Sequence, residues 1–168
     1  MVSVEMAESE VDLDAVRDLC RAFVAWHRVA HTDDIELIER YFDEEDFEAE
    51  LAGLPGYYAP PAGRLLLARS DGTPAGCVAL RDLGGGDCEM KRMFVPEAFR
   101  GQGVGRQLAE ALIAEAGWAG YRKMRLDTSH RQAAAMALYE SVGFRKAPPY
   151  YELPDDLADW LVFFEREL

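Results

Sequence analysis

The sequence predicts a mixed α/β fold, built as one domain over residues 1–168 with a central sheet flanked by about four helices. Two patterns lead to this fold class. In the first half of the chain, strand-like segments follow one another as a meander, which gives antiparallel neighbours in a sheet. In the second half, strands alternate with helices, which gives locally parallel neighbours. A chain of 168 residues with 49% hydrophobic residues suits a single domain with a sizeable core.

The chain begins with one strand and two helical regions. Residues 2–8 alternate apolar and polar side chains, as a strand does. Residues 13–27 place apolar side chains at the spacing of one helical face, and Asp12 or Asp14 is available as the N-cap. Residues 33–52 form a second, less regular helical region that contains ten acidic residues.

A meander of three strands follows a loop. The loop, LPGYYAPPAG at residues 54–63, breaks all periodicity and carries two adjacent tyrosines. Residues 64–70 and 75–82 then form a hairpin signal around the turn DGTP. Residues 88–95, CEMKRMFV, are the third strand of the series.

This third strand changes parity along its length. Cys88 and Met90 place apolar side chains on one face, whereas Met93 and Val95 place them on the other. A change of parity by one residue is what a β-bulge produces, and bulges occur next to active sites because they redirect side chains and end strand pairing. The alternative is a strand with both faces buried towards its end. We favour the bulge.

The second half alternates helices with strands. After the glycine-rich stretch RGQGVG, residues 104–117 have the pattern of a helix, and residues 121–128 that of a strand. Residues 133–142 are the next helix, which ends before a glycine. Residues 146–159, KAPPYYELPDDLAD, are predicted as a second proline-rich loop with paired tyrosines, and residues 160–168 as the last strand.

Composition excludes several classes of protein. The N-terminus has no basic region followed by an apolar stretch, and nowhere do about 18 apolar residues run together, so we expect a soluble cytoplasmic protein without a membrane partner. A net charge of −13 argues against a nucleic-acid partner. The three cysteines and the three histidines are scattered and lack metal-ligand spacing. We therefore expect reduced thiols, no metal, and surface or capping roles for His27, His31 and His130.

Charge is unevenly distributed along the chain. Residues 1–63 carry 16 acidic and 4 basic side chains, a net charge of −12, whereas residues 91–131 carry 8 basic and 4 acidic ones, a net charge of +4. The basic region suits an anionic ligand and the acidic region a cationic one. The alternative is that acidic helices simply keep the protein soluble.

The stretch RGQGVG, residues 100–105, is a candidate anion site. Glycine allows backbone N–H groups to converge on a ligand that approaches closely. At the N-terminus of a helix, those unpaired donors and the helix dipole favour a phosphate. The alternative is a tight strand-to-helix turn that binds nothing.

Two stretches in the right order resemble the GNAT superfamily of N-acetyltransferases. MFVPEAFRGQGVGRQLAEALI resembles its acyl-CoA segment, in which a strand precedes the pattern R/Q-x-x-G-x-G/A, here Arg100, Gly103 and Gly105. LDTSHRQAAAMALYESVGF resembles its second segment, with A-x-x-L-Y, here ending at Tyr139, and then G-F. Together they span roughly residues 88–145.

The resemblance implies a GNAT-like mixed sheet and acetyl-CoA as co-substrate, with direct transfer of the acetyl group to a primary amine. The glycine loop would then wrap the pyrophosphate, and the end of the bulged strand would hydrogen-bond the pantetheine arm. The residues that the resemblance assigns to the cofactor are Met93, Phe94, Val95, Arg100, Gly101, Gln102, Gly103, Val104, Gly105, Arg106, Gln132 and Ala135. Gln132 is a departure, because many relatives have asparagine at that position.

Acetyl transfer also needs a proton acceptor and a proton donor. Tyr139, matched to the family's tyrosine, is predicted to protonate the leaving thiolate. Glu89, on the bulged strand, is the best-placed general base, acting directly or through water. Its alternative is a surface carboxylate paired with Lys91 or Arg92. Backbone N–H groups near the end of this strand would polarise the thioester carbonyl.

The acceptor is an amine of a small molecule or peptide that the sequence does not identify. The two tyrosine-bearing loops, residues 54–63 and 146–159, are expected to line its site. They would alternatively pack on each other or form a homodimer interface. Two other functions stay open: an acyl-CoA sensor without catalysis, and an interaction protein whose glycine loop is only a turn.

Overall fold

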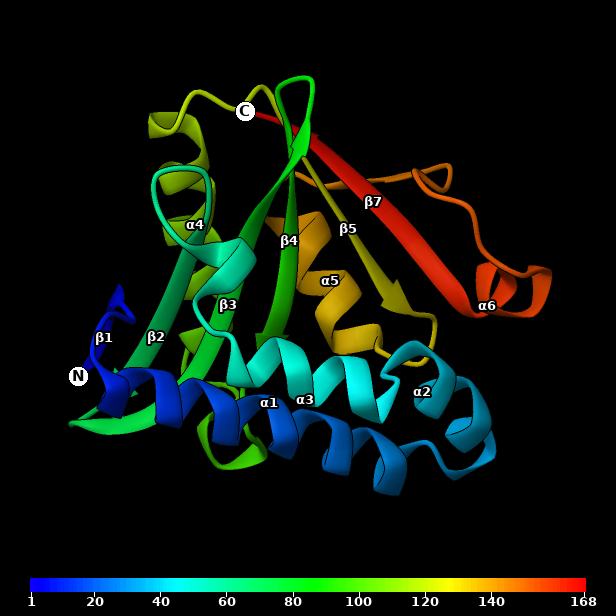
Figure 1. The fold of residues 1–168 in the computed structure, drawn as a ribbon, viewed down its shortest axis with the longest axis horizontal. Coiled ribbons are helices and arrows are strands. Elements are labelled where there is room, and N and C mark those ends of the chain that lie inside the picture. The colour runs from blue at the N-terminus through cyan, green and yellow to red at the C-terminus, as the bar shows by residue number, and fades with distance from the viewer.

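The computed structural model describes all 168 residues, folded around one seven-stranded sheet with the order β1-β2-β3-β4-β5-β7-β6 (Figure 1). Strands β1 to β4 are antiparallel, β4 and β5 are parallel, and β7 runs antiparallel to both β5 and β6. The predicted mixed sheet is therefore confirmed. The strands are β1 (Val2–Met6), β2 (Arg64–Ser70), β3 (Thr73–Gly84), β4 (Asp87–Phe94), β5 (Lys123–Ser129), β6 (Arg145–Ala147) and β7 (Leu161–Glu167).

Six helices cover the two faces of the sheet, two more than predicted. They are α1 (Glu10–Ala30), α2 (Ile35–Tyr41), α3 (Glu44–Ala52), α4 (Val104–Trp118), α5 (Ala133–Ser141) and α6 (Asp155–Trp160). Residues 33–52 divide into α2 and α3 because Asp43 caps a new helix, its carboxylate accepting the Asp46 N–H at 3.1 Å. Residues 146–159, predicted as a loop, contain part of β6 and most of α6, whose N-cap is Pro154.

The N-cap of α1 is Ser9, and not Asp12 or Asp14 as predicted. The Ser9 hydroxyl accepts the Asp12 N–H at 3.1 Å, while the Asp12 carboxylate accepts the Ser9 N–H at 3.2 Å. Asp12 thus closes a capping box from inside the first turn. The predicted buried face is confirmed, from Leu13 at one end to His27 at the other.

The hydrophobic core lies in two layers, one on each side of the sheet. One layer packs α1, α2, α3 and α6 against the face that Figure 1 presents, and the other packs α4 and α5 against the opposite face. All three cysteines are buried and unpaired. None of the helices is both long and apolar enough to cross a membrane.

A β-bulge in β4 opens the sheet, as the parity change predicted. Ala79 of β3 pairs with Lys91, but Cys77 pairs with Phe94, so β4 has one residue more than its partner in this interval. Arg92 takes up the extra length with a φ of 59°. Strand β4 pairs with β5 only over residues 87–89, and the two strands then diverge, as Figure 1 shows. The divergence leaves a gap in the middle of the sheet.

Candidate active site

The largest site at this gap is a cleft of about 480 Å³. It is formed by the end of β4, the glycine loop, the N-terminus of α5 and the C-terminal half of α1. Eleven of the twelve residues assigned to the cofactor line it: Met93, Phe94, Val95, Arg100, Gly101, Gly103, Val104, Gly105, Arg106, Gln132 and Ala135. The twelfth, Gln102, instead donates from its amide to the Ala98 carbonyl at 3.0 Å. The structure thus brings the sequence-selected residues together around one cavity.

The glycine loop has the geometry of an anion cradle. Gly101 and Gly103 have φ values of 75° and 81°, which L side chains rarely adopt. Gly103 is the N-cap of α4, so the first N–H groups of the helix lack helical partners, and the residues that carry them line the cleft. A Cβ placed on Gly103 would come no closer than 4.0 Å to another group, which is the Gln107 amide. The space in front of the loop is therefore open.

Helix α1 forms one wall of the cleft through Trp26. The Arg100 guanidinium lies 4.5 Å from the centre of the Trp26 ring and donates to the Val95 carbonyl at 2.9 Å. The indole N–H of Trp26 donates to Glu97 at 3.1 Å. These contacts fix α1 against the glycine loop. The sequence analysis did not predict this wall, although Trp26 is an aromatic residue next to the buried face of the helix and could have indicated it.

A smaller chamber of about 50 Å³ adjoins the cleft, and Phe23, Met93 and Gln132 line both. Tyr139 lines this chamber and is 5% exposed. Its ring packs against Phe144 and Phe164, with centroids 6.0 and 6.1 Å apart, and its hydroxyl has no hydrogen-bond partner in the protein. Burial raises the pKa of the Tyr139 phenol, so the group keeps its proton at neutral pH.

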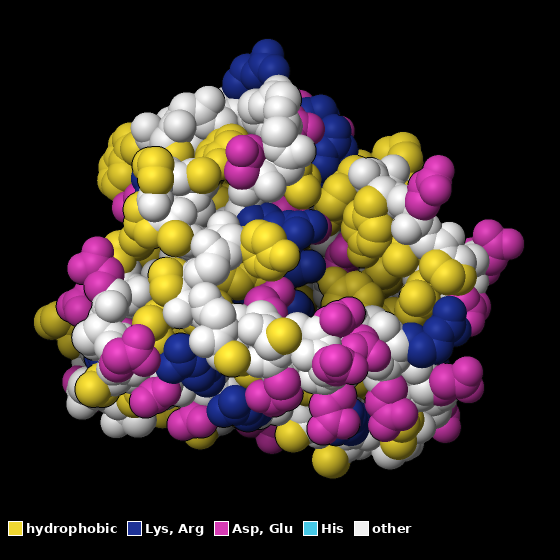
Figure 2. Space-filling view, viewed as in Figure 1, with side chains coloured by type: hydrophobic (Ala, Val, Ile, Leu, Met, Phe, Trp, Pro, Cys, Tyr) yellow, Lys and Arg dark blue, Asp and Glu magenta, His cyan; other side chains and the backbone are white.

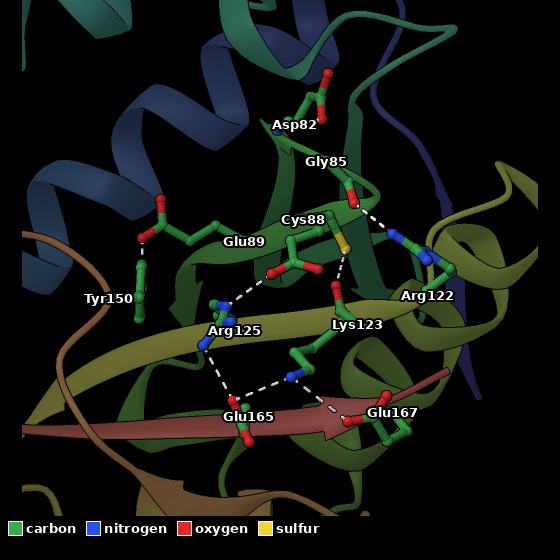
Figure 3. Close-up of polar contacts among 12 residues, drawn as sticks. Asp82, Gly85, Cys88, Glu89, Arg122, Lys123, Arg125, Tyr150, Glu165 and Glu167 are labelled. Atoms are coloured by element: carbon green, nitrogen blue, oxygen red, sulfur yellow. Dashed lines mark hydrogen bonds and ion pairs between the residues drawn. The ribbon is translucent and has the colours of Figure 1, made fainter.

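Glu89 also lines the chamber, and it is a buried carboxylate, 2% exposed. The expected alternative of a surface group is therefore wrong. Arg81 donates to it at 2.6 Å, the Tyr150 hydroxyl donates to its other oxygen, and the Lys91 ammonium lies 3.8 Å away. Figure 3 shows the Tyr150 contact. Arg92, the other partner considered, is bound instead to Glu50 at 2.7 Å.

An ionic network holds the paired end of the strands together. Arg125 on β5 lies 3.0 Å from Asp87 on β4. Arg125 also lies 3.0 Å from Glu165 on β7, and Lys123 lies 3.6 Å from Glu165 (Figure 3). Glu89 is the last residue of β4 that pairs with β5. The network therefore fixes one end of the gap, and Glu89 marks the place where the strands begin to separate.

Asp127 is a chamber residue that the sequence reading missed. It receives hydrogen bonds from the hydroxyls of Tyr41 and Tyr151, and burial raises the pKa of its carboxyl. Tyr150 and Tyr151 thus connect the second predicted loop to the chamber. The first predicted loop does not line either cavity: Tyr58 is buried in the core and Tyr57 is 70% exposed.

His27 is buried, which agrees with its place on the predicted helical face but not with the surface or capping role expected of the histidines. Its Nδ1 lies 2.8 Å from Nδ1 of His31, and its Nε2 lies 3.4 Å from the Gln132 amide nitrogen. Burial lowers the pKa of His27 to about 4, so the ring is neutral near pH 7. The pair supports Gln132 at the boundary between the cleft and the chamber. Scattered sequence positions gave no signal for this contact between α1 and the start of α5.

Comparison with known proteins identifies the family. The model of the acetyltransferase (GNAT) family matches residues 21–144. An uncharacterized N-acetyltransferase of Schizosaccharomyces pombe is 39% identical over 132 residues, which cover 73% of this chain and 81% of the relative. The IAA acetyltransferase of Azospirillum brasilense is 41% identical, covering 66% of this chain and 71% of the relative.

A solved structure has the same fold. The PaiA N-acetyltransferase of Thermoplasma acidophilum, in complex with coenzyme A, superposes with a TM-score of 0.74 at 16% identity, covering 100% of this chain and 99% of that one. The family match spans both the glycine loop and Tyr139. The chain therefore belongs to the acetyltransferase (GNAT) family and is an N-acetyltransferase.

Proposed function

We propose that the protein transfers an acetyl group from acetyl-CoA directly to a primary amine of a small molecule or peptide. The observation that carries this proposal is that the cradle at the start of α4 lines a cleft that shares three wall residues with the Tyr139 chamber. The Thermoplasma acidophilum relative, crystallised with coenzyme A, supports the choice of cofactor. Acetyl-CoA would supply the activated thioester.

The residues of the cleft suit such a ligand. The open space before Gly103 and the unpaired N–H groups of the α4 N-terminus fit a pyrophosphate. The backbone of residues 93–95, at the end of β4 that has left β5, offers hydrogen bonds to an extended pantetheine arm. Apolar walls from Phe23, Phe99 and Leu138 exclude water along the arm. We expect no metal to take part.

The chamber holds groups for both proton transfers. A primary amine with a pKa near ~10.4 requires about 4 to 5 kcal/mol to become neutral at pH 7, so a base is useful. Glu89 accepts this proton directly or through a water, and the amine nitrogen bonds to the acyl carbon. As the carbon–sulfur bond breaks, Tyr139 donates its phenolic proton to the thiolate. Backbone N–H groups near Phe94 and Val95 polarise the carbonyl oxygen.

Glu89→Gln tests the base. The amide preserves the shape of the side chain but does not accept a proton, so kcat/KM at pH 7 is expected to fall about 100-fold. The loss of activity should become smaller at a pH above the pKa of the free amine, because the amine is then already neutral and the base is not needed. Steady-state assays from pH 6 to 10 measure both effects. Glu165→Gln, which removes a carboxylate from the ionic network outside the chamber, is the matched control.

A Glu89→Gln protein with the activity and pH profile of the parent would remove Glu89 from the mechanism. Asp127→Asn, assayed in parallel, then decides whether the second chamber carboxylate is the base instead. We also propose a cytoplasmic location, which three buried, unpaired cysteines support.

A further inference from the structure

The two carboxylates of the chamber already have partners. Glu89 accepts a hydrogen bond from Arg81 on one oxygen and from the Tyr150 hydroxyl on the other. Asp127 accepts a hydrogen bond from the Tyr41 hydroxyl on one oxygen and from the Tyr151 hydroxyl on the other. Each of these carboxylate oxygens thus accepts a hydrogen bond from within the protein.

One cation of the chamber has an ion pair but no hydrogen bond. The Lys91 side chain is 19% exposed and lines the chamber, yet its ammonium makes no hydrogen bond, and its nearest carboxylate is Glu89 at 3.8 Å. An ammonium has three N–H donors, and leaving them unsatisfied in a buried site is costly. Burial accordingly lowers the pKa of Lys91. A ligand that brings anionic oxygens would satisfy these donors.

The neighbouring guanidinium groups are not available for this purpose. Arg92 binds both oxygens of Glu50 at 2.7 and 3.1 Å and lies over the rings of Phe42 and Phe47. Arg81 is bound to Glu89. Lys91 has only a 3.8 Å ion pair with Glu89, so it is the cationic side chain of the chamber whose N–H donors are left to bind an acceptor.

A second polar group of the chamber is also unpaired. The Ser129 hydroxyl, at the end of β5, is buried without a hydrogen-bond partner. It adds a short-range donor and acceptor on the β5 side, whereas Lys91 lies on the β4 side. On the face that Figure 2 shows, Lys and Arg side chains lie near the centre next to hydrophobic ones, above many acidic side chains.

We propose that Lys91 binds a carboxylate of the acceptor, and that the acceptor is a small amine of the amino-acid class. The inference rests on the proposed function and narrows its substrate. The acidic residues of α1 and α3 do not decide the acceptor, because the chamber itself contains Lys91 beside carboxylates that are already satisfied. The small chamber suits an amine and a carboxylate that are close together on one molecule.

The test compares three acceptors that share a side chain: L-alanine, L-alaninamide and ethylamine. Rates are referred to the concentration of neutral amine, because the three amines differ in pKa. We expect the parent to prefer alanine over alaninamide by at least ~10-fold in kcat/KM, equivalent to about 1.4 kcal/mol. The same ratio is measured for aspartate against its α-carboxamide and for asparagine against its α-carboxamide, so that the result does not depend on one side chain.

Lys91→Met retains the length and apolar stem of the side chain but removes the charge. We expect it to reduce the amino-acid-to-amide ratio at least ~10-fold, mainly through KM for the amino acid. Lys91→Arg should recover part of the ratio because it restores a cation. Lys146→Met, on the exposed strand β6, is the control and should keep the parent's ratio. Melting curves and acetyl-CoA affinity verify that each variant is folded.

Two results would overturn the assignment of Lys91. If amides or simple amines react as well as amino acids, the proposal that the acceptor carries a carboxylate is refuted, while the proposed transferase activity stands. Equal losses for amino acid and amide in Lys91→Met would refute carboxylate binding by this residue. Binding of acetyl-CoA without acetylation of any amine would refute the proposed function and the acceptor class together.

Discussion

Replacing Tyr139 with phenylalanine is expected to lower kcat at saturating acceptor by at least ~10-fold, and general-acid catalysis is typically worth about 100- to 10,000-fold. The substitution removes one oxygen and leaves the ring contacts with Phe144 and Phe164 in place. The hydroxyl has no protein hydrogen bond to lose, so the fold and the acetyl-CoA dissociation constant should change little. The effect should therefore fall on chemistry and not on binding.

The measurement is kcat for both proteins beside cofactor affinity from calorimetry. Tyr121→Phe is the control, because this tyrosine donates to the Ala62 carbonyl outside both cavities. A single-turnover experiment establishes that chemistry limits the parent. An unchanged rate of the chemical step would reduce Tyr139 to a packing residue, and weaker binding with an unchanged kcat would make it a cofactor contact only.

Replacing Gly103 with valine is expected to remove most of the rise in melting temperature that acetyl-CoA gives the parent. A ligand held only by the folded state stabilises it by about 2.7 kcal/mol at 100 times its dissociation constant. A side chain at Gly103 would occupy the open space in front of the loop, where the pyrophosphate is proposed to lie. The N–H groups at the start of α4 would then be screened from the ligand.

Gly120→Val is the matched control for backbone strain. Gly120 has a φ of 91° and no group within 4 Å of an added Cβ, and it lies outside the cleft. Both variants should lose a similar free energy of unfolding, of about 1–2 kcal/mol, because an L residue is placed in the left-handed region. Only Gly103→Val should lose the ligand. Equal acetyl-CoA affinity in the two variants would contradict the cradle.

Local signals in the sequence were sufficient for the glycine loop and the bulge. The parity change after Met90 and the glycines at 101 and 103 each record a backbone constraint within a few residues, and the structure has the bulge at Arg92. Buried helical faces were readable for the same reason. Such patterns depend on the periodicity of a single element and do not require the partner to be known.

The chamber was harder to predict because its contacts join distant elements. Asp127 meets Tyr41 across 86 positions, and Gln132 meets His27 across 105. No local pattern specifies which of many acids or histidines will be buried together. The short elements β6 and α6 were not predicted for a related reason. The formation of β6 depends on pairing with β7, and that of α6 on packing against α2, more than on the propensity of their own residues.

The most direct test of the account is a crystal structure of the protein with coenzyme A. We expect the pyrophosphate oxygens within about 2.7–3.2 Å of backbone N–H groups in the loop from Gly101 to Arg106. We expect the pantetheine arm along the separated end of β4, with the sulfur at the Tyr139 hydroxyl. A pyrophosphate bound away from the glycine loop, or a sulfur out of reach of Tyr139, would contradict the account.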